Sequence, residues 1–147
     1  MTKSISRKDP TTLKNHMKAI EQSYFIHAPL SDVWNALVVP KVIDAWGGGP
    51  VTMIDKVGEK FSLWGGSIWG VNKEVLHKKK LVQEWYSDSD NAPWDKPSLV
   101  TFMLHLEKDG VTLTLVQTNV PDVDAKDIEE GWKDYYLGPL KEYLEKK

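Results

Sequence analysis

The chain has 147 residues, no cysteine and a formal net charge of −2. A chain of this length suits one domain with one core, because it can bury about 68–70% of its unfolded surface. The near-neutral charge gives no electrostatic argument for nucleic-acid binding. The absence of cysteine excludes disulfides, thiolate metal sites and cysteine nucleophiles, and it fits a reducing compartment, so we expect the cytoplasm.

Neither a membrane span nor an export signal is expected. The longest apolar stretch, residues 33–39, is short and interrupted by Asn35, and the N-terminus lacks the apolar segment of a signal peptide. We therefore expect a protein that works without crossing a membrane.

Residues 1–18 are polar and mostly basic, and we interpret them as an N-terminal extension that precedes a single domain, residues 19–147. The extension is either a solvated tail or a docking arm for an anionic partner, and its modest charge favours the tail. Asp9 and Pro10 could start a short helix. Three apolar residues then follow at helical spacing: Leu13, Met17 and Ile20.

The domain is predicted to begin with one strand and two short helices. Residues 20–26 alternate as a strand does. Residues 30–37 have apolar side chains at helical spacing, with Pro29 or Ser31 at the start. Pro40 breaks this helix and can begin another that extends to Trp46.

A run of strands follows, separated by turn residues. The segments predicted as strands are 51–56, 60–64, 67–77, 81–87, 98–108 and 111–120. Asp109-Gly110 is typical of a two-residue hairpin turn between the last two. Connections this short leave no room for crossover helices, so the pattern indicates an antiparallel meander.

Residues 124–147 are predicted to form a closing amphipathic helix that Asp124 caps. One stripe of this helix carries Ile128, Trp132, Tyr136, Leu140 and Tyr143. Gly138-Pro139 interrupts the pattern, at a local cost of about 3 kcal/mol for proline and about 1 kcal/mol for glycine. Each large apolar side chain contributes roughly 1.5–3 kcal/mol when buried, so we expect the helix to continue, with a bend near Tyr135.

Several segments together resemble the homologues of the activator of heat-shock protein 90 ATPase, a family of the START-like (SRPBCC) superfamily. The segments that carry the resemblance are residues 27–37, Trp46, Val57-Gly58, Phe61, residues 81–85, residues 113–115 and residues 130–136. The similarity extends over roughly residues 19–144. It implies an α+β helix-grip fold, in which a curved antiparallel sheet wraps around a long C-terminal helix and two short helices follow the first strand.

The resemblance also implies functions. Members of the superfamily bind lipids, hormones or other apolar molecules between the sheet and the helix, and some are enzymes. Relatives with a C-terminal domain of this kind stimulate the chaperone ATPase and so belong to the stress response. The eukaryotic activators carry a further N-terminal chaperone-binding domain, for which this chain is too short.

Large aromatic side chains are the candidates for a ligand site. Trp85 shares a strand face with Leu81, Trp69 can face inward from its strand, and Trp132 lies opposite them on the helix. Tyr136, Tyr24 and His105 could orient a ligand by hydrogen bonding. The alternative is that these rings pack against one another and leave no vacancy.

Three functions are therefore open. The preferred one is a non-enzymatic domain that binds a small apolar molecule through Trp69, Trp85, His105, Trp132 and Tyr136. The second is a regulatory domain that binds a protein, such as a chaperone. The third is an enzyme that uses Tyr136 or His105 as acid or base; the scattered histidines and the lack of a metal motif argue against it. We expect no cofactor, and a monomer or homodimer.

Overall fold

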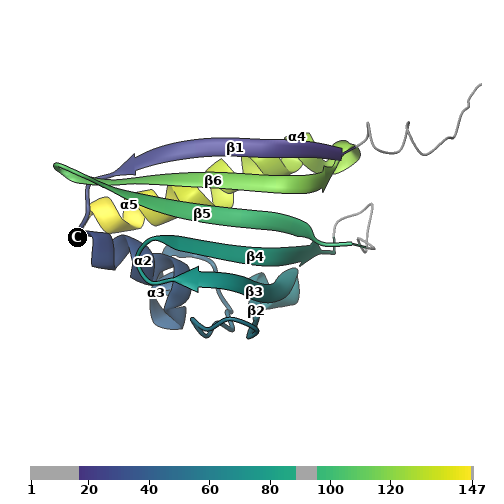
Figure 1. Ribbon diagram of the computed structural model, residues 1–147, viewed down its shortest axis with the longest axis horizontal. Helices are drawn as coiled ribbons and strands as arrows, with labels where there is room; N and C mark the ends of the chain where they lie inside the picture. Colours follow the sequence, from purple (N-terminus) through teal and green to yellow (C-terminus); the bar gives the residue numbers. More distant parts are fainter. Residues whose placement is uncertain (1–16, 89–95, 147) are drawn as a thin grey trace, which may run out of the picture.

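A computed structural model describes residues 17–88 and 96–146 (Figure 1). Its strands are β1 (Met17–Ile26), β2 (Lys60–Leu63), β3 (Ile68–Leu76), β4 (Lys80–Ser87), β5 (Ser98–Glu107) and β6 (Gly110–Pro121). Its helices are α2 (Leu30–Val38), α3 (Pro40–Trp46), the 3₁₀ turn η1 (Trp64–Gly66), α4 (Asp122–Gly131), the π-helical turn η2 (Trp132–Leu137) and α5 (Gly138–Glu145).

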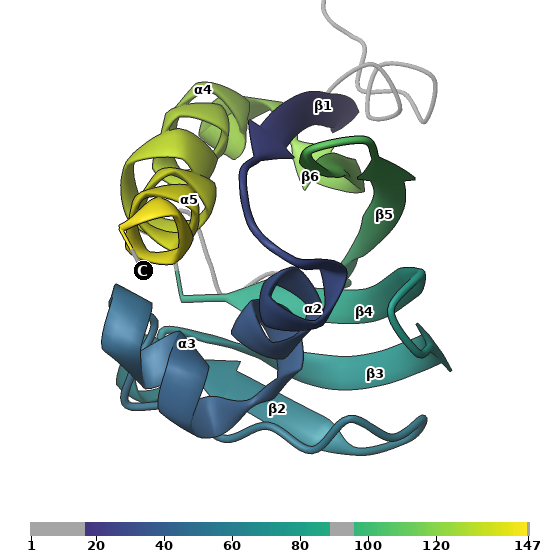
Figure 2. The same cartoon turned by 90° about the vertical axis from the view of Figure 1, so that its left-hand side faces the viewer.

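All six strands form one antiparallel sheet in the order β1-β6-β5-β4-β3-β2. Phe102 lies opposite Leu115 and Leu104 opposite Leu113, so the predicted hairpin is confirmed. Its two-residue loop is shifted by one residue to Lys108-Asp109, because Gly110 begins β6 and pairs with Glu107. The sheet is curved, and the chain formed by α4, η2 and α5 lies along its concave side, with α2 and α3 near one end (Figure 2). The predicted helix-grip architecture is therefore confirmed.

The core lies between the concave face of the sheet and the helices. Alternate residues of each strand point into it, as Val100, Phe102, Val111 and Leu113 do on β5 and β6. From the closing helix, Trp132, Tyr136 and Leu140 are buried against them. The apolar stripe that the sequence predicts is thus the face that packs on the sheet, which is the usual reason for such a stripe.

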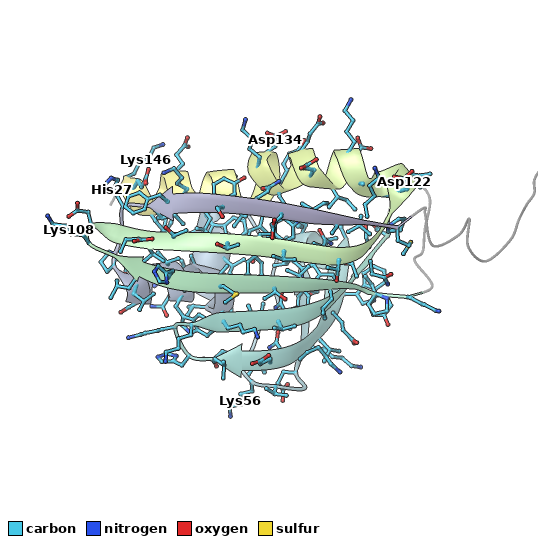
Figure 3. All side chains as sticks on the ribbon, turned by 45° about the horizontal axis from the view of Figure 1, so that its top comes forward. His27, Lys56, Lys108, Asp122, Asp134 and Lys146 are labelled. Atoms are coloured by element: carbon cyan, nitrogen blue, oxygen red, sulfur yellow. The ribbon has the colours of Figure 1, made fainter. Side chains whose placement is uncertain are left out.

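The closing helix also bonds to the free edge of β1. Lys141 Nζ donates to the carbonyl of Phe25 at 2.6 Å, and the backbone N–H of His27 donates to Glu145 Oε2 at 3.0 Å. Further along the helix, Gln22 Nε2 donates to the carbonyl of Glu129 at 2.9 Å. The first two bonds occupy backbone groups at the end of β1 that an exposed edge strand would otherwise offer to another chain, and the third joins a β1 side chain to the helix backbone. Charged side chains such as Asp122, Asp134 and Lys146 project outward from this helix (Figure 3).

The interruption expected near Tyr135 is a π-helical turn rather than a sharp bend. Pro139 has no N–H, and the N–H of Gly138 bonds to the carbonyl of Lys133, five residues back. A Cβ on Gly138 would collide with that carbonyl oxygen. The glycine-proline pair therefore permits one wide turn, and the helix continues through it to Glu145.

Residues 51–56 do not form the predicted strand. Thr52 makes a single bridge to Ser62, and Asn72 Nδ2 donates to the carbonyls of Ile54 and Lys56, at 2.7 and 3.1 Å. A buried side chain thus satisfies the carbonyls that a strand partner would have used.

Two terminal predictions also need correction. The short helix proposed after Asp9 falls largely on residues 1–16, which lie outside the described residues, but Met17 and Ile20 belong to β1. Asp124 does not cap the closing helix; α4 begins at Asp122, and Asp124 is buried within its first turn. Within residues 17–88 and 96–146, no helix has the length and apolar character needed to cross a bilayer.

Candidate functional site

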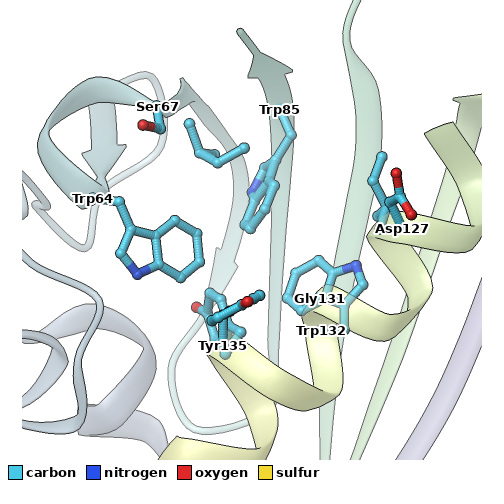
Figure 4. Close-up of a pocket in the computed structure, with 10 residues that line it drawn as sticks. Trp64, Ser67, Trp85, Asp127, Gly131, Trp132 and Tyr135 are labelled. Atoms are coloured by element: carbon cyan, nitrogen blue, oxygen red, sulfur yellow. The ribbon is translucent and has the colours of Figure 1, made fainter. Parts of the chain in front are cut away.

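An open pocket of about 430 Å³ lies between the C-terminal helix and the strands β3 and β4 (Figure 4). Aromatic side chains supply most of its wall: Trp64, Trp85, Trp132, Tyr135 and Tyr136. The rest of the lining is Ser67, Ile68, Asp127, Ile128 and Gly131. The surface of the pocket is almost entirely apolar, so it suits a molecule with an apolar body.

Trp85, Trp132 and Tyr136 form the buried side of the pocket. Trp85 points inward from β4, while Trp132 and Tyr136 stand one helical turn apart on the face that covers the sheet. Their ring centroids lie 4.8 Å apart for Trp85–Trp132 and 4.9 Å apart for Trp132–Tyr136. The three side chains are 5%, 3% and 2% exposed, respectively. The cluster is therefore well packed, and the vacancy lies beside it rather than within it.

Two buried glutamines fix the indole rings. Trp85 Nε1 donates to Gln83 Oε1 at 2.8 Å, and Trp132 Nε1 donates to Gln117 Oε1 at 2.7 Å. Gln83 Nε2 donates in turn to Asn72 Oδ1 at 2.9 Å. Buried polar groups are costly unless they are paired, so this chain of bonds holds each ring in one orientation.

Trp64 forms the opposite wall, and its backbone adopts an unusual conformation. Its φ of 49° lies in the left-handed region, which large side chains rarely enter. Its backbone N–H donates to the carbonyl of Gly48 and its Nε1 donates to the carbonyl of Gly47, at 2.9 and 2.8 Å. These bonds to the end of α3 hold the ring nearly perpendicular to Tyr136, at 78° and 6.1 Å.

Burial determines the ionisation of Tyr136. Because its ring lies in the core, desolvation raises the pKa of Tyr136 far above its ordinary value. The phenol therefore stays neutral at any physiological pH. It can donate or accept a hydrogen bond, but it does not supply a phenolate base.

The structure brings together three of the five predicted site residues. Trp85, Trp132 and Tyr136 line the pocket. Trp69 does not face inward: it stacks on Tyr86, at 5.9 Å and 10°, on the convex face of the sheet. His105 is exposed on that convex face, because its neighbour Leu104 points into the core. His105 and Tyr136 therefore cannot act on a common ligand.

Tyr24 also has a structural partner. Its hydroxyl donates to Gln22 Oε1 at 2.8 Å, and Tyr24 is not part of the pocket lining. Partial burial, with a smaller contribution from the charge of Asp134, raises the pKa of Tyr24. Its hydrogen bond thus joins neighbouring side chains of β1 rather than a ligand.

Comparison with known proteins identifies the family. The model of the family "Activator of Hsp90 ATPase homolog 1-like protein" matches residues 27–145. The chain belongs to this family. A Dictyostelium discoideum protein named Activator of 90 kDa heat shock protein ATPase homolog is 33% identical over 141 residues, which cover 94% of this chain and 34% of that protein. The human Activator of 90 kDa heat shock protein ATPase homolog 1 is 22% identical over 120 residues, 80% of this chain and 34% of that protein. The chain spans about a third of the length of these curated relatives.

Solved structures of similar proteins share the fold. An Hsp90 activator from Plasmodium falciparum superposes with a TM-score of 0.75 and 24% identity, covering 86% of this chain and 95% of that one. The Aha1 dimer from Colwellia psychrerythraea gives 0.73 and 16%, covering 88% and 97%. Protein MLL2253 from Mesorhizobium loti gives 0.74 and 24%, covering 88% and 98%.

In this member of the activator-homologue family, only three of the ten described lining residues, Trp85, Trp132 and Tyr136, are among the site residues predicted from the sequence. The sequence pattern places Trp64 at the end of the predicted strand 60–64, and Tyr135 and Asp127 lie beside the apolar stripe of the helix rather than on it. The glycines at residues 47–49 and 65–66 are the sequence feature that could have indicated the position of Trp64, because glycine permits close approach of two backbone segments. The π-helical turn spans both Trp132 and Tyr136. Gly138-Pro139 predicts such a turn only if the helix is already known to continue beyond the proline.

Proposed function

We propose that this domain binds a small molecule with an apolar body in the pocket beneath the C-terminal helix. One observation carries the proposal: a 430 Å³ pocket lined by five aromatic side chains opens between the helix and the sheet. Small-molecule sites in proteins commonly have volumes of about 300–1,000 Å³ and mostly apolar walls. An apolar ligand would be stabilised there by leaving water.

The rigidity of the walls supports binding further. Hydrogen bonds hold the indoles of Trp64, Trp85 and Trp132 before any ligand arrives. A ligand would not have to order these side chains, so little of its binding free energy would be lost to entropy. The strained backbone of Trp64 fits the same interpretation, because strained residues are found preferentially at functional sites.

We assign Trp85, Trp132 and Tyr136 to the buried floor of the site and Trp64 to its opposite wall. Tyr135, which is 68% exposed, would cover the ligand from the solvent side. Trp69 and His105 are left out of the assignment, because both lie on the convex face. Tyr136 would contribute contact and a neutral hydroxyl, so binding alone, without catalysis, is the simpler function.

Fluorescence titration with the neutral dye Nile red tests the proposal. Ile68→Trp would place a large ring in the pocket and should abolish the rise in dye fluorescence. Leu99→Trp introduces the same side chain at a position on the convex face that is 40% exposed, and it should leave binding unchanged. Equal binding by both variants would put the dye elsewhere and would contradict the proposal.

A second candidate function is association with a chaperone. The 33% identical Dictyostelium relative is named as an activator homologue of the 90 kDa heat shock protein ATPase, and the family model has a similar description. The shared region is 34% of that relative, so activity of the whole relative need not reside in it. Measuring the ATPase rate of the purified 90 kDa chaperone with and without the full chain tests this candidate; an unchanged rate, with no complex in sedimentation, would contradict it.

The compartment and the oligomeric state are proposed on narrower grounds. The cysteine-free sequence favours the cytoplasm. The neighbour from Colwellia psychrerythraea is described as a dimer. We therefore propose that this chain is either a homodimer or a monomer. Sedimentation of the free chain distinguishes the two states.

A further inference from the structure

The three indole N–H groups around the pocket all bond to the protein. Trp64 donates to the carbonyl of Gly47 at 2.8 Å, Trp85 to Gln83 at 2.8 Å and Trp132 to Gln117 at 2.7 Å. An indole has one N–H and no other donor. None of the three rings can therefore donate a hydrogen bond to a ligand, and each offers it only the ring face and the C–H edge.

The ring faces have an electrostatic preference. The face of an aromatic ring carries negative potential and attracts a cation that lies within about 6 Å of the centroid. Around this pocket the rings are not parallel: Tyr136 is at 78° to Trp64 and at 40° to Trp85. Trp64 stands across the space from Trp85 and Trp132 (Figure 4). A compact group between these walls would meet aromatic surface on several sides.

The charged lining residue acts in the same direction. Asp127, which is exposed, lies at the end of the pocket beyond Trp132 (Figure 4), and among the described residues of the lining it alone carries a formal charge at neutral pH. Lys126 and Lys133, on the same stretch of helix, are exposed and do not belong to the lining. Among the lining residues that the structure describes, a carboxylate ligand would therefore meet a like charge and no cationic partner, whereas a cation would be attracted.

Resting on the proposed function, we propose that the ligand is an organic cation with an apolar body, such as an alkyl- or aryl-ammonium ion. Its ammonium group would lie between the aromatic walls, attracted by the charge of Asp127 at the end of the pocket beyond Trp132, and its apolar part would cover the rest of the surface. The same arrangement disfavours fatty acids and other organic anions. The pocket thus discriminates by charge among ligands of similar size.

Three probes of similar shape test this preference by calorimetric titration of the full chain: benzyltrimethylammonium, its uncharged carbon isostere neopentylbenzene, and the anion phenylacetate. The cation should bind roughly 10-fold or more tightly than the anion. Comparing the two ions is the fair test, because both lose hydration on entering the pocket.

Variants assign the preference to this pocket. Asp127→Asn should weaken binding of the cation roughly threefold or more and leave the neutral isostere unchanged. Trp64→Leu keeps an apolar wall without a π face, so it should weaken the cation roughly 2- to 30-fold and the isostere less. Glu142→Gln makes the same charge change at a solvent-exposed ion pair of α5 and is the matched control. Circular dichroism verifies that each variant is folded.

The possible failures are distinguishable. If phenylacetate binds as tightly as benzyltrimethylammonium, or if Asp127→Asn weakens the cation and the isostere equally, the charge preference is overturned while the binding function stands. If none of the three probes binds and Nile red does not bind either, both proposals are overturned.

Discussion

Trp132 on the closing helix donates its indole N–H to the side-chain carbonyl of Gln117 on β6, over 2.7 Å. Both residues are buried, and Gln117 Nε2 donates onward to Ser98 Oγ at 2.9 Å. This bond fixes how the helix sits on the sheet, because the helix cannot slide or rotate without leaving a buried donor unpaired. The orientation of one pocket wall therefore depends on a polar residue outside the pocket.

Gln117→Leu should destabilise the fold. The substitution leaves the N–H of Trp132 buried without an acceptor, which costs about 1–3 kcal/mol in the free energy of unfolding. Urea denaturation of this variant, of Trp132→Phe and of the double variant measures the pairing. Because a phenyl ring has no N–H to satisfy, Gln117→Leu should cost less when Trp132→Phe is already present, with a coupling of about 0.5–3 kcal/mol. Strictly additive costs would contradict the bond's role.

Gly138→Ala should destabilise the π-helical turn. The new Cβ would collide with the carbonyl of Lys133, and relief of such overpacking costs about 1–3 kcal/mol. Gly131→Ala is the matched control: at Gly131 a Cβ would meet only Tyr135, at an ordinary 3.9 Å, so helix propensity should make it neutral or stabilising by up to about 1 kcal/mol. If the two variants had equal denaturant midpoints, a steric clash between a Cβ at position 138 and the carbonyl of Lys133 would be contradicted.

Much of the fold can be predicted from the sequence, because its elements repeat local patterns. The strands alternate, the turn signal at Asp109-Gly110 predicts the hairpin to within one residue, and the apolar stripe from Ile128 to Tyr143 packs on the sheet. The strand predicted at residues 51–56 does not form, because the side chain of Asn72 donates hydrogen bonds to the carbonyls of Ile54 and Lys56. Asn72 is distant in the sequence, and nothing within the segment indicates this pairing. Local sequence patterns do not predict hydrogen bonds between a backbone segment and a side chain far away in the sequence.

The candidate site could be predicted only in part, for a related reason. From the strand pattern Trp69 can face inward, but its neighbour Gly70 occupies the inner position. A Cβ on Gly70 would touch the ring of Phe61 and the carbonyl of Glu84, so Phe61 from the next strand fills the space that the glycine leaves. The larger ring therefore faces outward and stacks on Tyr86. Which face a strand residue takes is decided by its partners across the sheet.

The contact of Glu145 with the backbone N–H of His27, at the end of β1, should stabilise the fold to a degree that depends on pH. The backbone N–H of His27, followed by Lys141, lowers the pKa of Glu145 in the folded chain. Because the pKa of Glu145 is lower in the folded than in the unfolded chain, its carboxylate stabilises the fold fully above the unfolded-state pKa. This stabilisation is lost as the pH falls through the folded-state pKa. Glu145→Gln should therefore be less stable than the parent near neutral pH, by up to about 1 kcal/mol, and the difference should shrink as the solution is acidified.

The control for this comparison is Glu142→Gln. Its ion pair with Lys146 spans 3.4 Å, with both side chains more than 70% exposed, so its loss should change stability little at any pH. Thermal unfolding of the three proteins across acidic and neutral pH measures the effect. A stability difference for Glu145→Gln that grows as pH falls would contradict the assigned sign.

Indole N–H resonances test the central claim, binding beneath the closing helix, most directly. A ¹H–¹⁵N spectrum of the full chain should show separate signals for the tryptophans, which single substitutions to phenylalanine assign. On titration with the neutral aromatic 1-naphthol, the signals of Trp64, Trp85 and Trp132 should shift together with one dissociation constant, while that of Trp69 on the convex face stays in place. A titration in which Trp69 shifts and the three pocket signals do not move would contradict the account.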